Sequence, residues 1–433
     1  MGIVRHIFCS LLALALLLGV QATAQAQFDT IRVSVVLPLY ADWHPDSLSV
    51  KQLRLRDVAL EALAGVELAL DSLNAPPAHF EIAIVEAGED TSGARTFTRE
   101  TFADAHWIIG PLRRSPFAEV HHMAPDVAHL ALTDLGKSTL HLGRRVFMPY
   151  TPADVQMQAL AEFIRYQHPG ENKLMLASDS PRARRTEKAF RQRFNPPVSA
   201  DATPDSAAAL DSAAALDSAA TPDSALSAKA AHGDSLESPL VALDILREVP
   251  CTSKSLGGIW DSTVLFRRNI IVAPGGKACR SLAGQLQTES HVRDSIPIVL
   301  YAHQDWTGFN FLNWDWREEV AMTTPAQGFH AENDSLFDQF QSRYAERTGS
   351  APTNFSILAY DATLDVASRL VQLGNEWMTA DQASPVYPVK TVHHRFNWHT
   401  PDRAQGWINY AVRLVRQENY RLIELDLVVP EVK

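Results

Sequence analysis

The sequence predicts an α/β protein with two parallel β-sheets, each covered by helices on both faces. Three observations lead to this fold class. Short apolar runs with strand character alternate with amphipathic helical patterns from residue 31 onward. The same alternation starts afresh after residue 150, which indicates a second sheet. The chain has 433 residues, a length that favours two domains over a single core.

The first residues have the pattern of a cleavable signal peptide. Arg5 precedes an apolar run from Ile7 to Val20. Ala24 and Ala26 then form the A-x-A pattern of a cleavage site. The apolar run is shorter than the ~20 residues that a bilayer span needs. We therefore expect residues 1–26 to be removed and the mature protein to be exported to the periplasm.

The first lobe alternates between strands and helices as far as residue 134. The pattern is clearest over 55–74, where apolar residues recur at helical spacing. A later helix is expected to begin with Ser115 as its N-cap and Pro116 at its first position. Such alternation implies a parallel sheet with helices on both faces. The expected strands are 31–40, 80–90, 105–111 and 128–134, and the expected helices are 55–74, 91–103 and 115–127.

The second lobe repeats this pattern from residue 172. Two amphipathic helices and a closing pair of strands then complete the chain. The expected strands are 172–179, 240–249, 267–276 and 295–304, with the closing pair inside 408–429; the expected helices are 181–194, 277–288, 335–352 and 355–374.

An acidic, repetitive segment interrupts the second lobe at 196–240. Asp-Ser recurs in it every six residues, at Asp205, Asp211, Asp217 and Asp223, a period that suits neither a helix nor a strand. Because bulky apolar residues are scarce, burial cannot offset the entropy of ordering it, and we expect a disordered insert rich in Ala, Asp and Ser. A solubilising or tethering role is open, but a neutral expansion is the favoured interpretation.

Net charge excludes some partners. The formal net charge is −11, which argues against nucleic acid and against an anionic membrane surface. Much of this charge lies in the insert, so the two lobes are only mildly acidic.

Two cysteines, Cys251 and Cys279, remain after removal of the signal peptide. Each follows a predicted strand by a few residues, and the ends of parallel strands meet at one edge of a sheet. In an exported protein this placement permits a disulfide, with two free buried thiols as the open alternative.

Several segments, in their order along the chain, resemble a known family. They are "VVLPLY", "GVELALDSLN", "EAGED", "WIIGPL", "VAHLALTD" and "VFMPYTPADVQMQALAEF", followed much later by "LFDQFQSRYAERTGSAPTNFSILAYDATLDVASRL". This series is similar to the type I periplasmic binding proteins, which include the leucine/isoleucine/valine-binding proteins and related receptor ligand-binding regions. The resemblance covers nearly the whole mature chain except the insert.

The resemblance implies two Rossmann-like lobes joined by a three-strand hinge, with a ligand in the cleft between them and closure on binding. The first lobe would comprise 27–150 and 328–380. The second would comprise 151–327 and 381–433, with the C-terminal strands of uncertain lobe.

The stretch "AHWIIGPLRRSP" suggests where an acidic group of a ligand would bind. A strand ends there at Gly110-Pro111, and Arg113, Arg114 and Ser115 follow at the expected start of a helix. Guanidinium groups and free amides both favour negative charge. The family usually has small Ser or Thr residues here, so the arginines argue against a plain neutral amino acid. Solvated arginines, or arginines paired with a neighbouring acid, are the open alternative.

Other candidate ligand-binding residues match the family's cleft-facing loops. Aromatic side chains would cover a ligand and hydroxyl groups would orient it. Ordinary loop or capping roles are equally open for each of them. These residues are Tyr40, Thr133, Asp134, Tyr150 and Thr151 in the first lobe, and Ser178, His303 and Asp305 in the second.

Patterns for catalysis and metal binding are weak or missing. "LGKST" resembles the end of a phosphate loop but has Ala131 where that loop requires glycine. There is no G-x-S-x-G motif. The histidines near 121–129 and 393–399 show no zinc-ligand spacing, and we expect them on the surface. The aromatic stretch 306–319 suggests packing between the lobes, with carbohydrate stacking as the alternative.

These features together favour an exported, monomeric solute-binding protein without cofactor, metal or enzymatic activity. It would capture an amino acid or a similar small polar or anionic solute for an ABC-type transporter. A protein of the same fold that regulates peptidoglycan synthesis through protein contacts is the alternative, since the arginines and the long insert depart from an amino-acid clamp.

Overall fold

The computed structural model of the protein describes residues 30–73, 79–88, 97–195, 246–252, 254, 256–293, 295–374 and 390–425. The expected signal peptide and the acidic insert lie outside these residues. So do parts of the elements expected over 91–103 and 240–249. Within the described ranges, no helix has the length and apolar character that crossing a bilayer requires.

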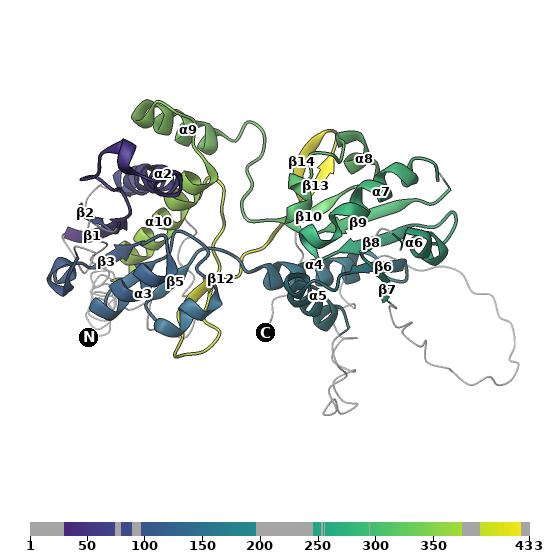
Figure 1. The fold of residues 1–433 in the computed structure, drawn as a ribbon, viewed down its shortest axis with the longest axis horizontal. Coiled ribbons are helices and arrows are strands. Elements are labelled where there is room, and N and C mark those ends of the chain that lie inside the picture. Colours follow the sequence, from purple (N-terminus) through teal and green to yellow (C-terminus); the bar gives the residue numbers. More distant parts are fainter. Residues whose placement is uncertain are drawn as a thin grey trace, which may run out of the picture. The chain divides into compact units, whose positions relative to one another are not determined.

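The first of two seven-stranded sheets in the described residues has the strand order β11-β12-β5-β4-β3-β1-β2 (Figure 1). Its neighbouring strands run parallel except for β11 and β12, which are antiparallel. In the register of β1 with β3, Val35 lies opposite Ile109. The strands are β1 (Thr30–Leu37), β2 (His79–Glu86), β3 (Trp107–Ile109), β4 (Ala128–Leu130), β5 (Val146–Met148), β11 (Trp398–His399) and β12 (Trp407–Asn409).

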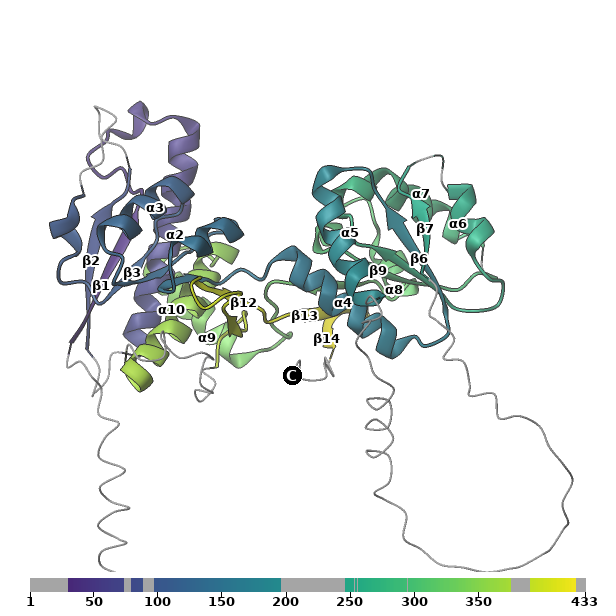
Figure 2. The ribbon, with the colours of Figure 1, turned by 90° about the horizontal axis from the view of Figure 1, so that it is seen from below.

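Helices cover both faces of this sheet. On one face, Val33 and Val35 pack with apolar residues of α2 and α10, which lie side by side (Figure 1, Figure 2). On the other face, Val36 packs with Phe102 and with Val120 of α3. Burial of both faces explains the nearly continuous apolar run of β1. The helices are α2 (Val50–Leu73), α3 (Arg114–Met123), α9 (Ser335–Thr348) and α10 (Asn354–Leu373), with short 3₁₀ turns at η1 (Pro45–Ser47), η2 (Arg99–Phe102) and η3 (Lys137–Leu142).

The second sheet repeats this order, as β14-β13-β10-β9-β8-β6-β7. β6 pairs in parallel with β7 and β8, and β9 pairs in parallel with β8 and β10. β13 and β14 are joined by Asn419 and Tyr420, whose positive φ angles suit a two-residue hairpin turn. The strands are β6 (Asn172–Ala177), β7 (Leu246–Pro250), β8 (Asn269–Ala273), β9 (Ile298–Ala302), β10 (Thr323–Ala326), β13 (Arg413–Glu418) and β14 (Arg421–Leu425).

Helices also cover both faces of the second sheet. Leu174 and Leu300 pack on one face with Leu286 of α7 and Trp316 of α8. On the other face, the ring of Tyr301 contacts Phe163 of α4. The helices are α4 (Ala153–Gln167), α5 (Pro181–Phe194), α6 (Leu256–Ser262), α7 (Arg280–Ser290) and α8 (Trp314–Glu319), with 3₁₀ turns at η7 (Gly276–Cys279) and η8 (Gln304–Gly308).

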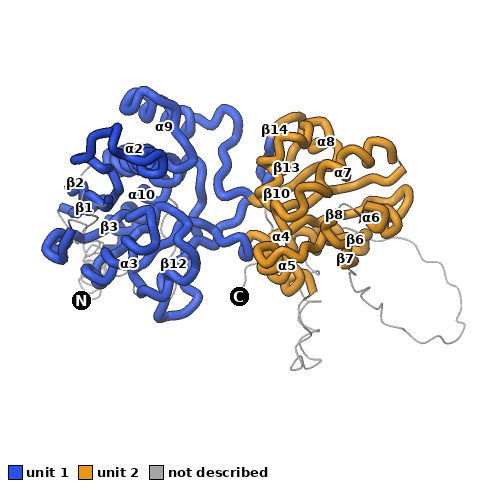
Figure 3. Tube along the Cα trace, viewed as in Figure 1, with its two compact units in different colours: residues 1–155, 326–415, 422–425 blue, residues 156–325, 416–421, 426–433 orange. Residues whose placement is uncertain are grey.

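The chain divides into two compact units (Figure 3). Unit 1 comprises 1–155, 326–415 and 422–425, and unit 2 comprises 156–325, 416–421 and 426–433. The predicted fold class, two α/β lobes with mostly parallel sheets, is confirmed. One assignment differs. Residues 381–433 were expected in the second lobe, with the lobe of the C-terminal strands left open. In the structure β11 and β12 complete the first sheet, because Trp407 and Ile408 pair with β5.

The aromatic residues of 306–319 lie mostly in the core of unit 2. Trp306 and Trp316 are fully buried and Phe309 nearly so, within the same cluster as Leu300. Trp316 also donates its indole N–H to Ser290 Oγ at 2.6 Å. The expected packing between the lobes is therefore wrong for these three residues, which pack inside one lobe.

The expectation of surface histidines was wrong for His121, His129 and His394. His121 and His129 are buried, and their Nδ1 atoms lie 2.8 Å apart, so one ring donates to the other. His121 Nε2 also lies 3.0 Å from the carbonyl oxygen of Leu142. His394 is buried against the Asp361 carboxylate. Hydrogen bonds to fixed partners make this burial tolerable, and sequence spacing does not reveal such partners.

These histidines make stability depend on pH. Burial holds the pKa of His129 well below its usual range, with His121 adding to the effect, and burial lowers the pKa of His121 itself. The native state keeps the pair neutral, while the unfolded chain takes up protons below about pH 6.5. Stability is therefore complete above that pH and is lost as the pH falls. Between pH 7 and pH 5, proton uptake by the unfolded chain at His129 should therefore lower the free energy of unfolding.

Denaturant titrations at a series of pH values measure this dependence. Replacing the pair together, His121→Leu with His129→Leu, should make the pH dependence shallower. The exposed His44, changed to Leu, is the control and should leave it unaltered. Equal slopes in the wild type and the double variant would contradict the prediction.

Candidate functional site

Each sheet has a point at which the strand order reverses. When the strands of each lobe are counted along the chain, the spatial order of the first five is 2-1-3-4-5. The second strand lies on one side of the first strand and the third lies on the other side. This reversal leaves a crevice at the carboxyl ends of the strands. In unit 1 the reversal lies between β1 and β3, and in unit 2 between β6 and β8. These two edges are where the fold positions polar loop residues.

A pocket of about 220 Å³ lies at this edge of unit 1. The loops after β1, β2 and β3 form it together with the first turns of α2 and α3. Its lining is Pro38, Tyr40, Ser49, Lys51, Gln52, Leu55, Ala87, Gly88, Pro111, Leu112, Arg113 and Pro116. Two of the residues expected from the sequence, Tyr40 and Arg113, therefore share one pocket.

Tyr40 forms a buried wall of this pocket. It has a positive φ of 51°, an uncommon conformation for an aromatic residue, and its ring meets Trp43 edge-on. Gly88 makes room for the ring, since a Cβ there would lie 2.9 Å from Tyr40 Cε1. Strained backbone of this kind is concentrated at functional sites.

Glu86, at the end of β2, binds backbone amides next to the pocket. Its Oε1 accepts hydrogen bonds from Leu39 N (3.0 Å) and Gly88 N (2.5 Å), and its Oε2 accepts one from Ala41 N (3.3 Å). The loop after β1 is thus fastened to the end of β2 by a carboxylate of the chain itself. Sequence analysis missed this role, although a Glu at a strand end two residues before a Gly was a signal.

The N-cap and the first helical position of α3 lie two residues earlier than predicted. The helix begins at Arg114, with Arg113 in extended conformation as its N-cap, so Ser115 is inside the first turn. Pro116 is tolerated there because the first-turn N–H groups lack helical partners. Arg113 lines the pocket, and Arg114 and Ser115, although exposed, do not.

The other expected residues of unit 1 have structural partners. Thr133 Oγ1 donates a hydrogen bond to the Leu112 carbonyl oxygen at 2.7 Å and so helps to fix the loop after β3. Thr151 Oγ1 donates to the Ala411 carbonyl oxygen at 2.7 Å, and Thr151 is buried. Burial, with a smaller effect of the Asp134 charge, raises the pKa of Tyr150 to about 12. Ligand contacts by Thr133, Asp134, Tyr150 and Thr151 stay predictions.

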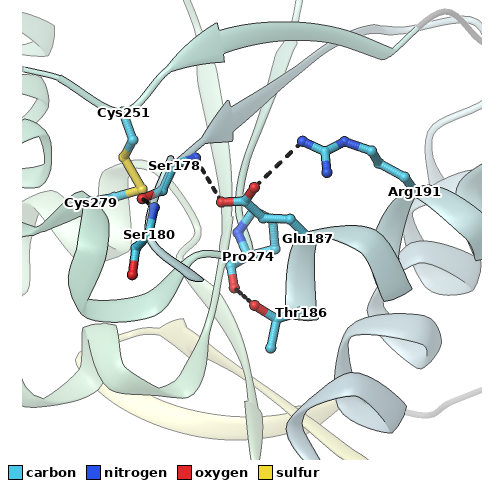
Figure 4. The surroundings of a disulfide bond; sticks show 8 residues. All are labelled: Ser178, Ser180, Thr186, Glu187, Arg191, Cys251, Pro274 and Cys279. Carbon is cyan, nitrogen blue, oxygen red and sulfur yellow. Dashed lines mark hydrogen bonds and ion pairs between the residues drawn. A yellow bond between two sulfur atoms is a disulfide. The ribbon is translucent and has the colours of Figure 1, made fainter. Parts of the chain in front are cut away.

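In unit 2 another carboxylate occupies the equivalent edge. Glu187 of α5 is buried, and its Oε1 accepts the Ser178 N–H at 2.7 Å just beyond β6 (Figure 4). Its other oxygen faces Arg191, and Thr186 Oγ1 donates to the Pro274 carbonyl oxygen at 2.9 Å. Burial raises the pKa of Glu187, against the lowering effects of the Ser178 amide and Arg191.

His303 and Asp305 follow β9 at the same edge. His303 is the N-cap of η8, and its Nδ1 accepts the Asp305 N–H at 3.1 Å. Burial lowers the pKa of His303, although the Asp305 charge acts in the opposite direction. The structure thus brings Ser178, His303 and Asp305 to the carboxyl edge of one sheet, and their contact with a ligand stays a prediction.

Cys251 and Cys279 form a disulfide with a Cα–Cα distance of 5.3 Å (Figure 4). It links the residue after β7 to the start of α7 beside the Ser178 loop. Of the two alternatives left open by the sequence, the bonded one is confirmed. No group of three or more His, Cys, Asp or Glu side chains in the described ranges could hold a metal ion.

With the fold and these edges described, comparison with known proteins becomes informative. No family model and no curated protein matches the chain. Solved structures do match, among them a protein assigned to branched-chain amino acid ABC transport in Rhodospirillum rubrum. It is 12% identical, with a TM-score of 0.57, and the match covers 92% of this chain and 100% of that one. The fold is that of the type I periplasmic binding proteins.

Two further structures agree with this fold. The periplasmic ligand-binding protein of a branched-chain amino acid ABC transporter from Burkholderia xenovorans LB400 is 11% identical, with a TM-score of 0.51 and coverage of 92% and 94%. Haemophilus influenzae LpoA is 10% identical, with a TM-score of 0.52, and the match covers 92% of this chain and 59% of LpoA. At these identities the likeness concerns the fold.

A test of the pocket architecture compares two glycines with similar positive φ angles. Gly110 (φ +84°) and Gly136 (φ +82°) both disfavour a side chain, but only at Gly110 would a Cβ meet an atom, the Val36 carbonyl oxygen at 2.3 Å. Gly136→Ala should cost about 1–2 kcal/mol of backbone strain. Gly110→Ala should cost about 2 kcal/mol more than Gly136→Ala, because the added Cβ would clash with the Val36 carbonyl oxygen. Chemical denaturation measures both, and equal losses would rule out the close approach.

The disulfide should stabilise the protein substantially. Its cysteines are 28 residues apart in sequence, and closing a loop of this size corresponds to about 3.5 kcal/mol. The double variant Cys251→Ser with Cys279→Ser should lose this amount in denaturant titrations. Reduction of the mature wild type should give the same loss, because no other cysteine follows Cys9. An unchanged unfolding transition after reduction would contradict the expected stabilisation by the disulfide.

Proposed function

We propose that the protein is an exported solute-binding protein that captures an amino acid or a similar small polar or anionic solute and delivers it to an ABC-type transporter. The observation that carries the proposal is the pocket at the β1/β3 reversal of unit 1, where this fold class binds ligands. Tyr40 and Gly88 shape its wall, and Arg113 supplies charge. Two of the structural neighbours, whose names assign them to branched-chain amino acid ABC transport, support the proposal through the shared fold.

In the proposed function the protein binds its solute without transforming it, so no catalytic group is required. Periplasmic location agrees with the expected signal peptide at 1–26. In this account a monomer with one bound solute meets the membrane transporter.

A second candidate is an envelope protein of the same fold that acts through protein contacts. Glu187 favours it, because a carboxylate of the chain already accepts the Ser178 amide at the β6/β8 reversal. A ligand acid would have to compete with it there. The similarity in fold to LpoA is compatible with this candidate.

Thermal unfolding in the presence of solutes separates the two candidates. A solute at 100 times its Kd stabilises the protein that binds it by about 2.7 kcal/mol, so the midpoint should rise for one member of a panel of amino acids and small anions. Tyr40→Ala should remove the rise. Tyr166→Ala is the matched control, since Tyr166 is 64% exposed and outside the pocket. Unchanged midpoints across the whole panel would favour the protein-contact candidate.

A further inference from the structure

The geometry points to a ligand with net negative charge in the unit 1 pocket, a small dicarboxylate or an amino acid with an acidic side chain. This inference rests on the solute-binding function proposed above and narrows its ligand class. Two side chains supply the positive charge: Lys51 from the first turn of α2 and Arg113 from the N-cap of α3. Lys51 was not among the residues expected from the sequence.

The positive charge of the pocket is not neutralised by its own lining. Among the residues that the structure describes, neither aspartate nor glutamate lines the pocket. Neither Lys51 nor Arg113 forms an ion pair with any residue in the part of the chain that the structure describes. Both are exposed, so a ligand in the pocket can reach them.

Glu86 is next to the pocket but is held by other groups. Its two oxygens accept three backbone N–H groups, those of Leu39, Ala41 and Gly88. A carboxylate with this many amide partners is fixed in place. The amides occupy three of the roughly four acceptor sites of Glu86, and Glu86 forms no ion pair with Lys51 or Arg113 in the described ranges.

The neutral polar side chains of the pocket also present donors. Gln52 Oε1 accepts both the Ser49 N–H (2.9 Å) and the Ser49 hydroxyl (2.7 Å). Because a backbone N–H can only donate, it fixes the orientation of the Gln52 amide, with the NH₂ group turned away from Ser49. The oxygen is thus occupied, and the NH₂ group is left to donate. The pocket offers the Lys51 ammonium, the Arg113 guanidinium and this NH₂ group.

This set of donors selects for acceptor-rich ligands. A neutral zwitterionic amino acid brings one carboxylate and one ammonium, and the ammonium finds no carboxylate among the described lining residues. A dicarboxylate brings an acid group for each cation, and charge-assisted hydrogen bonds are about twice as strong as neutral ones. We therefore expect acidic solutes to bind more tightly than their neutral analogues by about tenfold or more.

Isothermal titration of the mature protein with four solutes tests this inference. Succinate and glutamate should bind, and glutamine and leucine should bind at least tenfold more weakly. Raising the salt concentration should weaken the binding of succinate, because salt screens exposed charges.

Three single variants locate the site. Lys51→Gln and Arg113→Gln should each weaken glutamate binding about tenfold. Arg114→Gln is the matched control, because Arg114 is the adjacent exposed arginine but does not line the pocket. Thermal midpoints without ligand should be alike for all three.

The outcomes separate the two proposals. Tight binding of leucine or glutamine without binding of the acidic solutes would overturn the anionic ligand class and leave the solute-binding function standing. Binding of glutamate that is unaffected by Lys51→Gln and Arg113→Gln would overturn the site. Failure of all four solutes, and of the wider panel in thermal unfolding, would overturn the solute-binding function itself.

Discussion

Backbone N–H groups at the carboxyl ends of parallel strands need acceptors, and the chain supplies acceptors from its own carboxylates. In unit 1, Glu86 binds three such amides around the loop after β1. In unit 2, Glu187 binds the amide of Ser178 after β6. Unpaired amides would be costly in these partly buried loops. Each carboxylate therefore holds its loop in one conformation, and the shape and charge of each sheet edge depend on it.

The two sheet edges differ in where the carboxylate that binds the amides is located. Glu86 lies at the end of β2 and stays out of the pocket lining, so Tyr40, Lys51 and Arg113 surround a space with donor character. Glu187 comes from the helix after β6 and is itself buried at the reversal point. One lobe thus has an open, positively charged edge, whereas the other has an internal carboxylate at the corresponding position.

The fold was largely predictable from the sequence, and the site only partly so. Apolar runs such as 31–37 identify buried parallel strands, so Tyr40 and Arg113 could be placed at strand ends. Lys51 could not, because its position depends on how the first turn of α2 packs beside the loop after β3. The lobe of the short strand β12 could not be predicted, since a pairing between Trp407 and Phe147 leaves no local pattern.

The core of unit 1 combines residues from the beginning and the end of the chain, which limits when it can form during synthesis. Val33 and Leu70, near the start, share one apolar cluster with Val366, Trp398 and Trp407. Among the described residues, the apolar cluster of unit 2 lies between Leu174 and Met322. During synthesis this cluster can therefore pack before the core of unit 1, which waits for the last quarter of the chain; β13 and β14 also join the second sheet only then.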